Sequence, residues 1–306
     1  MPVRPSAMSV RVSVVGAYGV GLTFDLDVVP EAGETVSCRS FVQHHGGKGS
    51  NQAVAAARLG AMVSLQTALG DDAFGEGARS LWEREGVAAA ALVCAGTPTM
   101  VGAILVEPDG ENRIVIAPGA LERFTPEHLD ASLIFGSDVL LVQLEIPLAT
   151  AAQALAMARR AGVRSVLNPA PAPAVPDVVG LVSSADIVTP NLREARRLLG
   201  GVTAPGDQLA ARLARSTGGT VVLTAGASGA YVAHDGALTH VEALPVDPIV
   251  DSTGAGDAFS AALGVALADG ADPIEAARFA TRAAAHCVSV PGVIPGLPRR
   301  EDLEHQ

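Results

Sequence analysis

The stretch VLLVQLEIPLATAAQALAMARRAGVRSVLN (Val139–Asn168) holds the pattern that decides the fold class. It opens with a short, mostly apolar run and closes, from Val163, with a second run of the same kind. Between the two runs, Pro147 opens an alanine-rich segment, and proline is favoured in the first turn of a helix. The order strand, helix, strand is typical of a crossover unit, which places its two strands parallel.

The same alternation extends in both directions along the chain. Strands are expected at residues 10–16, 63–70, 185–191 and 220–226, and helices at 50–61, 71–87 and from Leu192 onward. Acids open the helix at 71–87 and Gly86 ends it. Repeated short links between strands and helices predict a three-layer α/β/α fold, with a mainly parallel sheet covered on both faces.

Two stretches, 22–45 and 97–118, interrupt this alternation, because they carry turn residues and no helical spacing. The second contains Asp109-Gly110 between two β-branched runs, which is a strong hairpin signal. We therefore expect one α/β domain over residues 1–306, with a small antiparallel β lid inserted from about residues 22–43 and 97–117. The proline-rich segment 168–177 is interpreted as a surface loop of that domain and not as a linker.

Composition and charge exclude several classes of function. The chain has 21 basic and 32 acidic residues, a net charge of −11, and no basic cluster that would bind a nucleic acid backbone. No run of apolar residues is long enough to predict a membrane span. The N-terminus lacks the basic start, apolar stretch and small-residue cleavage site that follow one another in a signal peptide. The cysteines, at positions 38, 94 and 287, are odd in number and widely spaced, which favours reduced thiols in the cytoplasm.

Two glycine clusters resemble nucleotide motifs without matching them. GAYGVG (16–21) follows a strand but is not followed by a helix, so a dinucleotide site is not expected there. HHGGKGSNQA (44–53) lacks the Ser or Thr that follows Lys in a P-loop. Its glycines could form a simple tight turn, but Lys48 and Asn51 beside them favour a small polar ligand held by hydrogen bonds.

A third cluster, DSTGAGDAF (251–259), places a Gly-Ala-Gly turn where a helix is expected to begin. The first amides of a helix have no helical partner and attract anions. Asp257 could be an ordinary acid of a first helical turn. An anion site and a carboxylate in one turn also suit phosphoryl transfer to an alcohol, which needs a base for the hydroxyl and donors for the phosphoryl group.

Four groups of motifs give the chain a resemblance to the ribokinase-like carbohydrate kinases. They are GGKGSNQAVAAARLGA with GDDAFGE, QLE followed by LNPAPA, TPNLREA, and DSTGAGDAF, in the order of the family and over essentially the whole chain. The resemblance implies a ribokinase-like fold with a β lid, and transfer of the γ-phosphoryl group of ATP to a primary hydroxyl of a small sugar. It also implies a homodimer joined through the lid.

The resemblance assigns roles to the residues of these motifs. It makes Asp257 the catalytic base and the amides of Gly254, Ala255 and Gly256 the anion hole for the phosphoryl group. Residues implied to bind the sugar are Gly46, Gly47, Lys48, Asn51 and Glu145. Residues implied to bind the nucleotide are Asn191, Thr224, Gly226, Ser228, Gly229, Gly256 and Thr281.

Two kinds of metal ion are implied in the same way. Asn191 and Glu194 would organise Mg²⁺ and its waters around the phosphates, which suits a hard ion that keeps water ligands. A monovalent cation, usually K⁺, would be held by Asp251, Thr253, Cys287, Val290 and Gly292. The family often supplies a serine hydroxyl to this cation at the position that is Gly296 here.

A second departure concerns the acceptor. In the loop after the first strand the family usually carries an Asn and an Asp that hold sugar hydroxyls, and these positions are Gly19 and Gly21 here. Their absence would open extra volume in the pocket and cost about 1–3 kcal/mol for each lost partner. The hypothesis is therefore that ribose is not the preferred acceptor and that another pentose, ketose or polyol is used. A nucleoside kinase and a sugar sensor without activity are the alternatives.

Four other side chains are interpreted from their local sequence patterns. His44 and His45 are adjacent on an expected strand, so at most one of them should line the sugar pocket. Trp82 is expected to pack in the core, and His286 to be a half-buried residue of a long helix.

Overall fold

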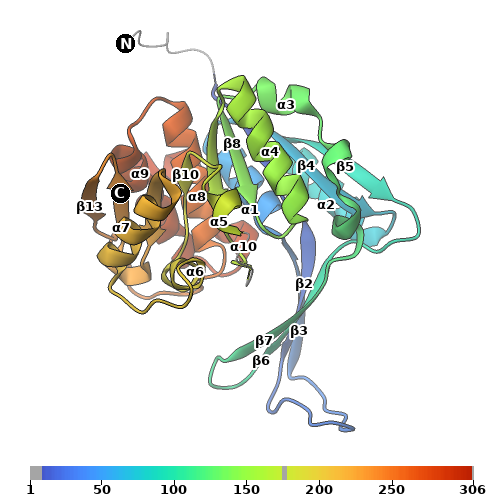
Figure 1. Cartoon of the computed structure of the whole chain (residues 1–306). Helices are drawn as coiled ribbons and strands as arrows, with labels where there is room; N and C mark the ends of the chain where they lie inside the picture. Colours follow the sequence, from blue (N-terminus) through green and yellow to red (C-terminus); the bar gives the residue numbers. More distant parts are fainter. Residues whose placement is uncertain (1–8, 174–177, 305–306) are drawn as a thin grey trace.

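The computed structural model describes residues 9–173 and 178–304 and contains a nine-stranded sheet in the order β13-β12-β11-β10-β9-β8-β1-β4-β5 (Figure 1). Its strands from β11 to β5 are parallel to their neighbours, and β12 and β13 form an antiparallel edge. The strands are β1 (Arg11–Val15), β4 (Met62–Gly70), β5 (Val87–Cys94), β8 (Val139–Gln143), β9 (Arg164–Asn168), β10 (Ile187–Val188), β11 (Thr220–Thr224), β12 (Ala230–His234) and β13 (Ala237–Val241).

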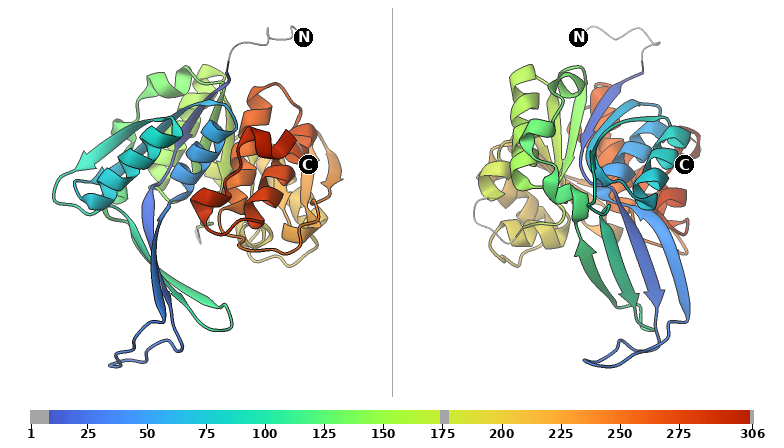
Figure 2. Two further views of the ribbon diagram at one scale, coloured as in Figure 1. Left: turned by 180° about the vertical axis from the view of Figure 1, so that it is seen from behind. Right: turned by 90° about the vertical axis from the view of Figure 1, so that its right-hand side faces the viewer.

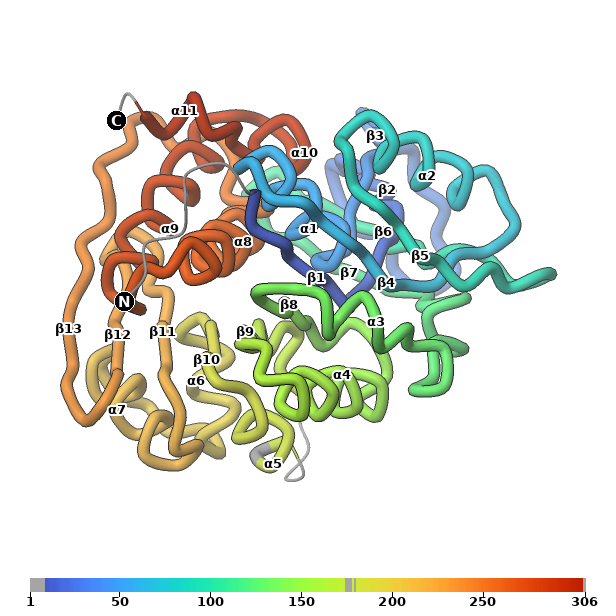
Figure 3. Tube along the Cα trace, turned by 90° about the horizontal axis from the view of Figure 1, so that it is seen from above, coloured from blue at the N-terminus to red at the C-terminus, as the bar shows by residue number. Residues whose placement is uncertain are grey.

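Helices cover both faces of this sheet, as expected, and the view from above shows the layers (Figure 3). One face carries α1 (Lys48–Arg58), α2 (Ala73–Glu85), α8 (Ala255–Ala268) and α9 (Pro273–Val288), followed by the short α10 (Val293–Gly296) and α11 (Arg300–Glu304). The other carries α3 (Ala131–Phe135), α4 (Leu148–Ala161), α5 (Val178–Val182), α6 (Leu192–Leu198) and α7 (Gly206–Thr217). The described residues also contain three 3₁₀ turns, η1 (Gly119–Arg123), η2 (Pro126–His128) and η3 (Gly226–Ser228).

Buried aliphatic residues on both faces of the sheet form the core. In β8, Leu141 packs with the residues of α1 and α8, whereas Leu140 and Val142 pack with those of α4. Alternate residues of a strand point to opposite faces, so a continuous apolar run is what a doubly covered strand requires. This explains why the stretch from Val139 decides the fold class.

A second sheet, here called the lid sheet, projects from one end of the main sheet (Figures 1 and 2). Its four strands lie in the order β3-β2-β6-β7 and are β2 (Gly19–Asp25), β3 (Ser40–Gly46), β6 (Val101–Val106) and β7 (Asn112–Ala117). The two outer pairs are antiparallel, and Gly110 has a positive φ of 86° in the expected β6–β7 turn. The central pair, β2 with β6, is parallel, because both strands run outward from the main sheet.

The structure differs from the sequence patterns in two parts of the main sheet. Neither β5 nor the β12–β13 hairpin is predicted above, and the strand expected at 185–191 is reduced to Ile187–Val188 ahead of Pro190. The hairpin turn is Asp235-Gly236, with φ values of 48° and 78°, which is the backbone that Asp-Gly turns favour. Residues 174–177 of the expected proline-rich loop lie outside the described residues.

Within the described ranges, no helix has both the length and the apolar character needed to cross a bilayer.

Candidate active site

The candidate site lies at the carboxyl ends of the central strands, where parallel sheets commonly bind ligands. Gly16 follows β1, Glu145 follows β8, and Asn191 follows β10. Asn191 pairs as an isolated bridge with Thr224, the last residue of β11. The N-termini of α1 and α8 approach the same edge, since residues of both helices bond to each other there. The fold therefore gathers most of the motif residues at one place.

The first turn of α8 supplies amides and a carboxylate together. Gly254 precedes the helix with φ 86°, a left-handed backbone that favours glycine, and the first intrahelical bond runs from the amide of Ala258 to the carbonyl of Gly254. The amides of Gly256 and Asp257 therefore precede that bond and point out of the helix end. The Asp257 side chain is only 5% exposed. Geometry of this kind can hold an anion beside a buried base.

Two amide side chains of α1 hold the carboxylate of Asp257. Asn51 donates from Nδ2 to Oδ2 at 2.8 Å, and Gln52 donates from Nε2 to Oδ1 at 3.1 Å. Gln52 in turn accepts a hydrogen bond from Gln143 Nε2 at 2.5 Å. Both oxygens of Asp257 are thus positioned by a chain of amides that runs from β8 through α1.

Sequence patterns alone did not single out Gln52 or Gln143 as site residues. Gln52 lies in the quoted stretch GGKGSNQA, and Gln143 opens QLE, so their motifs were visible but their partners were not. The helical position after Asn51 and the last position of β8 meet only once α1 packs on the sheet.

α1 approaches the sheet closely because of two glycines. Gly47, which precedes the helix, has φ 86°. A Cβ on Gly49 would lie 2.5 Å from the backbone carbonyl carbon of Gly16, so no larger residue fits. These contacts bring the start of α1 against the end of β1, while Gly46 remains the last residue of β3 in the lid sheet.

Lys48 stands among three carboxylates. Its pKa is raised, chiefly by the charge of Asp257. Burial of the side chain opposes this rise, and the charges of Glu145 and Glu194 add to it. Burial raises the pKa of Glu145, although Lys48 opposes this. The pKa of Glu194 is raised for the same first reason, its burial. Three acids therefore face one cation, and burial favours the neutral forms of Glu145 and Glu194.

Glu145 is tied to α1 by its carboxylate. Its Oε2 accepts a hydrogen bond from the backbone amide of Lys48 at 2.7 Å, at the exposed amide end of the helix. Two nearby buried oxygens, Asn51 Oδ1 and Gln143 Oε1, have no hydrogen-bond partner among the described residues. Unpaired buried acceptors are unusual, and they provide polar contacts for a ligand hydroxyl or a water molecule.

Asn191 and Glu194 bond to each other at the start of α6. Glu194 accepts from the backbone amide and from Nδ2 of Asn191, both at 2.8 Å, and Asn191 Oδ1 accepts from the amide of Glu194 at 2.9 Å. This reciprocal cap leaves further lone pairs on the carboxylate, which suits contact with an ion through water. Within residues 9–173 and 178–304, no cluster of three or more His, Cys, Asp or Glu residues would cage a metal directly.

The loop before α8 is organised by Asp251. Its carboxylate accepts hydrogen bonds from the amides of Thr253 at 2.9 Å and Gly292 at 3.0 Å. Burial pushes the pKa of Asp251 up, but hydrogen bonds from Thr253 and Gly292, together with the nearby charge of His44, bring it below its ordinary value. The acid therefore stays ionised beside the turn of α8.

Position 296 faces the carbonyls expected to bind a monovalent ion. A Cβ on Gly296 would lie 3.0 Å from the carbonyl oxygen of Cys287 and 3.4 Å from that of Val290. The thiol of Cys287 donates to the carbonyl of Thr253 at 3.7 Å, and burial, followed by the charges of Asp257 and Asp251, raises its pKa to about 12. The expected ion ligands are thus close together in the fold, and glycine at 296 adds no oxygen to them.

Except for Asn191, the residues expected to bind the nucleotide lie at or after Thr224 in the chain. The turn η3 contains Gly226 and Ser228, and Gly229 follows it with φ 81°. The carbonyl of Ser228 is 2.6 Å from Nε2 of His240 in β13. Thr281 of α9 lines a shallow pocket near this strand together with His240, Val241, Glu242, Leu244, Arg278 and Arg282.

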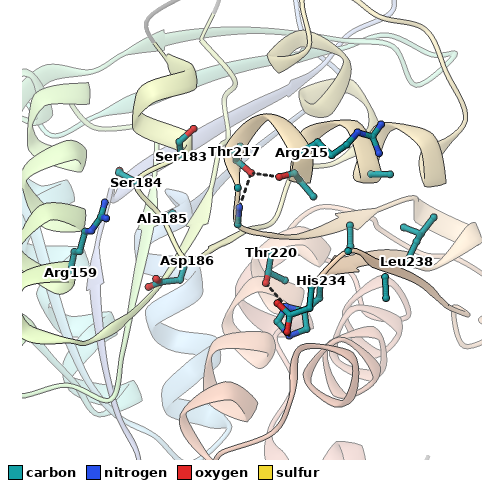
Figure 4. A pocket seen from close by; sticks show the side chains of 18 residues that line it. Arg159, Ser183, Ser184, Ala185, Asp186, Arg215, Thr217, Thr220, His234 and Leu238 are labelled. Atoms are coloured by element: carbon teal, nitrogen blue, oxygen red, sulfur yellow. Dashed lines mark hydrogen bonds and ion pairs between the residues drawn. The ribbon is translucent and has the colours of Figure 1, made fainter.

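A larger pocket lies at the opposite, amino-terminal ends of the strands and contains none of the expected site residues (Figure 4). Its wall includes Asp186 before β10, Thr220 at the start of β11 and His234 at the end of β12. Thr220 and His234 bond to each other at 2.7 Å.

The interpretation of Gly19 and Gly21 needs correction. They lie in β2 and not in a loop, and the volume above them is filled. A Cβ on Gly19 would lie 2.3 Å from Cε of Met100, and a Cβ on Gly21 would lie 2.1 Å from Cε1 of His44. The side chains of Met100, before β6, and His44, on β3, therefore occupy the space that side chains at positions 19 and 21 would need.

The two histidines of β3 point to opposite faces, as expected. His45 lies 2.7 Å from the hydroxyl of Tyr18, whose ring packs edge-on against Trp82. His44 lies on the face of Gly21 and Thr23, with Nε2 3.0 Å from Oγ1 of Thr23. Trp82 is 1% exposed, which confirms its place in the core. His286 is partly buried in α9, also as expected.

Comparison with known proteins shows what the chain is similar to. A model described as "pfkB family carbohydrate kinase" matches residues 17–300. The ribokinase of Haemophilus influenzae is 35% identical over 310 residues, which cover 97% of this chain and 100% of that protein. The ribokinase of Bacillus subtilis is 36% identical, with 96% and 98% covered. The structure of Arabidopsis thaliana ribokinase complexed with ribose and ATP has a TM-score of 0.90 at 30% identity, with 97% and 98% covered.

Proposed function

The chain belongs to the pfkB family of carbohydrate kinases and is a phosphotransferase with an alcohol as acceptor, and from this premise we propose that it transfers the γ-phosphoryl group of ATP to a primary hydroxyl of a small sugar or polyol. One observation carries the proposal most directly: the buried carboxylate of Asp257 lies in the same helical turn as amides that precede the first intrahelical bond.

Asp257 accepts the proton in the proposed reaction. The acceptor's O–H bond breaks, its proton passes to the Asp257 carboxylate, a new O–P bond forms, and the P–O bond to ADP breaks. Amides of the α8 turn, from Gly254 to Gly256, stabilise the negative charge on the migrating group. Asn51 and Gln52 hold the base in place, since each donates to one of its oxygens.

The sugar is proposed to lie between the start of α1 and the lid sheet. Gly46, Gly47, Lys48 and Asn51 come from this segment, and Glu145 approaches it from β8. The unpaired Oδ1 of Asn51 supports this placement, because a ligand hydroxyl could donate to it. Closure of the lid sheet would exclude water and so limit wasteful hydrolysis of ATP.

The residues present fit both proposed ions. Asn191 and Glu194 would hold Mg²⁺ through water, and Mg²⁺ would neutralise phosphate charge. Asp251, Thr253, Cys287, Val290 and Gly292 would hold K⁺, and the converging carbonyls near Gly296 support this site even though glycine provides no hydroxyl. The nucleotide would extend along Thr224, Gly226, Ser228 and Gly229 toward Thr281.

We further propose that the enzyme is a homodimer joined through the lid sheet, that it is cytoplasmic, and that ribose is not its preferred acceptor. Phe41, Ile114, Val115 and Ile116 of the lid strands are all more than half exposed, which supports a partner surface. The three cysteines, all free, are consistent with a reducing compartment.

A coupled assay of ADP release tests the proposal over aldopentoses, ketoses, polyols and nucleosides, each with and without K⁺. We expect release with at least one neutral sugar or polyol and a stimulation by K⁺. Release with no compound in the panel would favour a sugar sensor, and release only with nucleosides would replace the sugar by a nucleoside.

A further inference from the structure

We propose that His44 contacts the acceptor and selects an uncharged sugar or polyol, because its ring occupies the space that a side chain at position 21 would need. This inference rests on the proposed kinase function and concerns the acceptor pocket of the same site.

Gly21 is a glycine for reasons of space. It is not among the residues with positive φ, so its backbone would accept any residue. A Cβ at this position would lie 2.1 Å from Cε1, 2.6 Å from Nε2 and 2.8 Å from Nδ1 of His44. The polar edge of the imidazole thus lies directly over Gly21, its cross-strand partner. A side chain at 21 and the present position of the His44 ring exclude each other.

His44 faces the catalytic side of the lid sheet. Its neighbour His45 points the other way, toward Tyr18 and α2, where a Cβ on Gly77 would lie 3.6 Å from the His45 ring. His44 lies near enough to Asp251, in the loop that leads into α8, to contribute to the lowered pKa of that carboxyl group. The strand β3 also contacts α10, which borders the same loop. The imidazole therefore stands between the lid sheet and the turn that carries Asp257.

The imidazole has a weak contact that an acceptor hydroxyl can replace. Nε2 lies 3.0 Å from the hydroxyl of Thr23, whereas Nδ1 lies 3.4 Å from the carbonyl of His45, near the limit for a hydrogen bond. A sugar hydroxyl within 3 Å of Nδ1 would form a shorter bond. Ring and substrate would then share a polar contact on the side of the pocket formed by the lid sheet.

The charge of the site indicates an uncharged acceptor. Lys48 already faces the carboxyl groups of Asp257, Glu145 and Glu194, so it is not free to pair with the carboxylate of a sugar acid, and the ionised Asp251 lies close to His44. A sugar acid would bring one more carboxylate into this field, whereas a neutral polyol would bring only hydroxyls.

The test is a double-mutant cycle between positions 21 and 44, read as kcat and KM for the best neutral acceptor. His44→Ala should raise KM for that acceptor roughly tenfold while kcat and the KM for ATP change little. Gly21→Ala should have a similar effect, because its methyl group displaces the ring. In the His44→Ala background, Gly21→Ala should be nearly silent, and this loss of additivity is the signature of the shared space. The control is Gln43→Ala, at an exposed neighbour on the other face of β3.

Two outcomes overturn the inference. One is a KM for the acceptor in His44→Ala equal to that of the unaltered enzyme. The other is an aldonic acid that serves as well as the aldose of the same carbon number; a preference of at least about tenfold for the aldose is expected. If the unaltered protein releases no ADP with any compound, the proposed function fails, and calorimetric binding of the same acceptors to the unaltered protein and to His44→Ala still decides the role of His44.

Discussion

The carboxylate of Asp257 shows how single residues are specified by their neighbours. Asn51 and Gln52 are consecutive on α1, and each donates to a different oxygen of the same acid. A buried carboxylate that receives two hydrogen bonds is held in one orientation, which a positioned base requires. Asn51 Oδ1 has no partner in the described structure, so a turn of the Asn51 amide would break only the bond from Nδ2 to Asp257.

Asp257→Asn should therefore fold normally and lose turnover by about two to four orders of magnitude, the contribution of a positioned base. The new amide would face the donor on Asn51, but a flip of Asn51 turns its Oδ1 toward that amide and restores the pair. Single-turnover ADP release measures the loss, and thermal unfolding checks the fold. Turnover close to that of the unaltered enzyme would remove Asp257 from the mechanism.

Gln52→Glu tests the positioning role of α1 with almost no change in shape. The new carboxylate can still accept from Gln143 Nε2, but it faces Asp257 with a second negative charge instead of a donor. Like charges in a buried pair disfavour ionisation, so the acidic limb of the kcat–pH profile should move to higher pH. Unchanged limbs, with the KM for ATP as control, would show that Gln52 does not act on the base.

At the residue scale, the sequence predicts which residues belong to the site better than it predicts what those residues contact. The sequence indicates both motifs, the one with Lys48 and Asn51 and the one with Asp257, because glycines and polar residues occur together in each. It does not indicate the filling of space above Gly21, because His44 is 23 positions away and meets it only through the register of β2 and β3. A glycine in a sequence indicates a missing side chain, but only the cross-strand pairing reveals what occupies the space.

At the scale of elements, the two glycines at the start of α8, Gly254 and Gly256, have different structural roles. Gly254 needs its left-handed backbone, and a Cβ there would lie 2.9 Å from Cγ1 of Val293. Gly256 has no positive φ, and a Cβ there would meet nothing within 4 Å. The protein fold alone therefore explains Gly254 but does not explain why position 256 is a glycine.

Gly256→Ala should leave the protein as stable as before, or more stable by up to about 1 kcal/mol, because alanine is the better helix former. Its methyl group should nevertheless lower kcat at least about tenfold, since the space it enters is the proposed place of the phosphoryl group. Chemical denaturation and steady-state kinetics give the two values.

Gly254→Ala is the matched comparison, and it should lose stability as well as activity because of its backbone and its contact with Val293. An active Gly256→Ala enzyme would mean that the anion is held elsewhere.

Predictions of elements succeeded where the pattern was strong. The helix α2 begins after Asp72, which caps it through Gly75, and ends at Gly86 with φ 71°, as its sequence indicates. In contrast, β5 contains four consecutive alanines, which have weak strand propensity, and follows α2 directly. The β12–β13 hairpin, by comparison, turns at Asp235-Gly236, a dipeptide that indicates a hairpin in sequence.

At the scale of the whole molecule, the lid sheet exposes apolar side chains that no other part of the described chain covers. It projects from one end of the main sheet, and its strands expose apolar side chains far from the core (Figure 2). In β7 every residue is exposed. A twisted four-stranded sheet with apolar side chains facing water is a surface that a partner would cover. The fold of the body followed from alternation in one chain, but a pairing between two chains leaves no such pattern.

The proposed homodimer is tested by Val115→Lys. Val115 is 69% exposed on β7, so a lysine there costs the folded monomer little but places a charge inside a lid-to-lid interface. We expect the unaltered protein to sediment as a dimer at micromolar concentration and Val115→Lys to shift toward monomer. Met62→Lys, at a 62% exposed position of the main sheet, should remain dimeric. The two positions are similarly exposed, and only Val115 lies on the lid sheet. Equal dissociation of the two variants would therefore place the interface elsewhere. A monomeric unaltered protein would rule out the dimer.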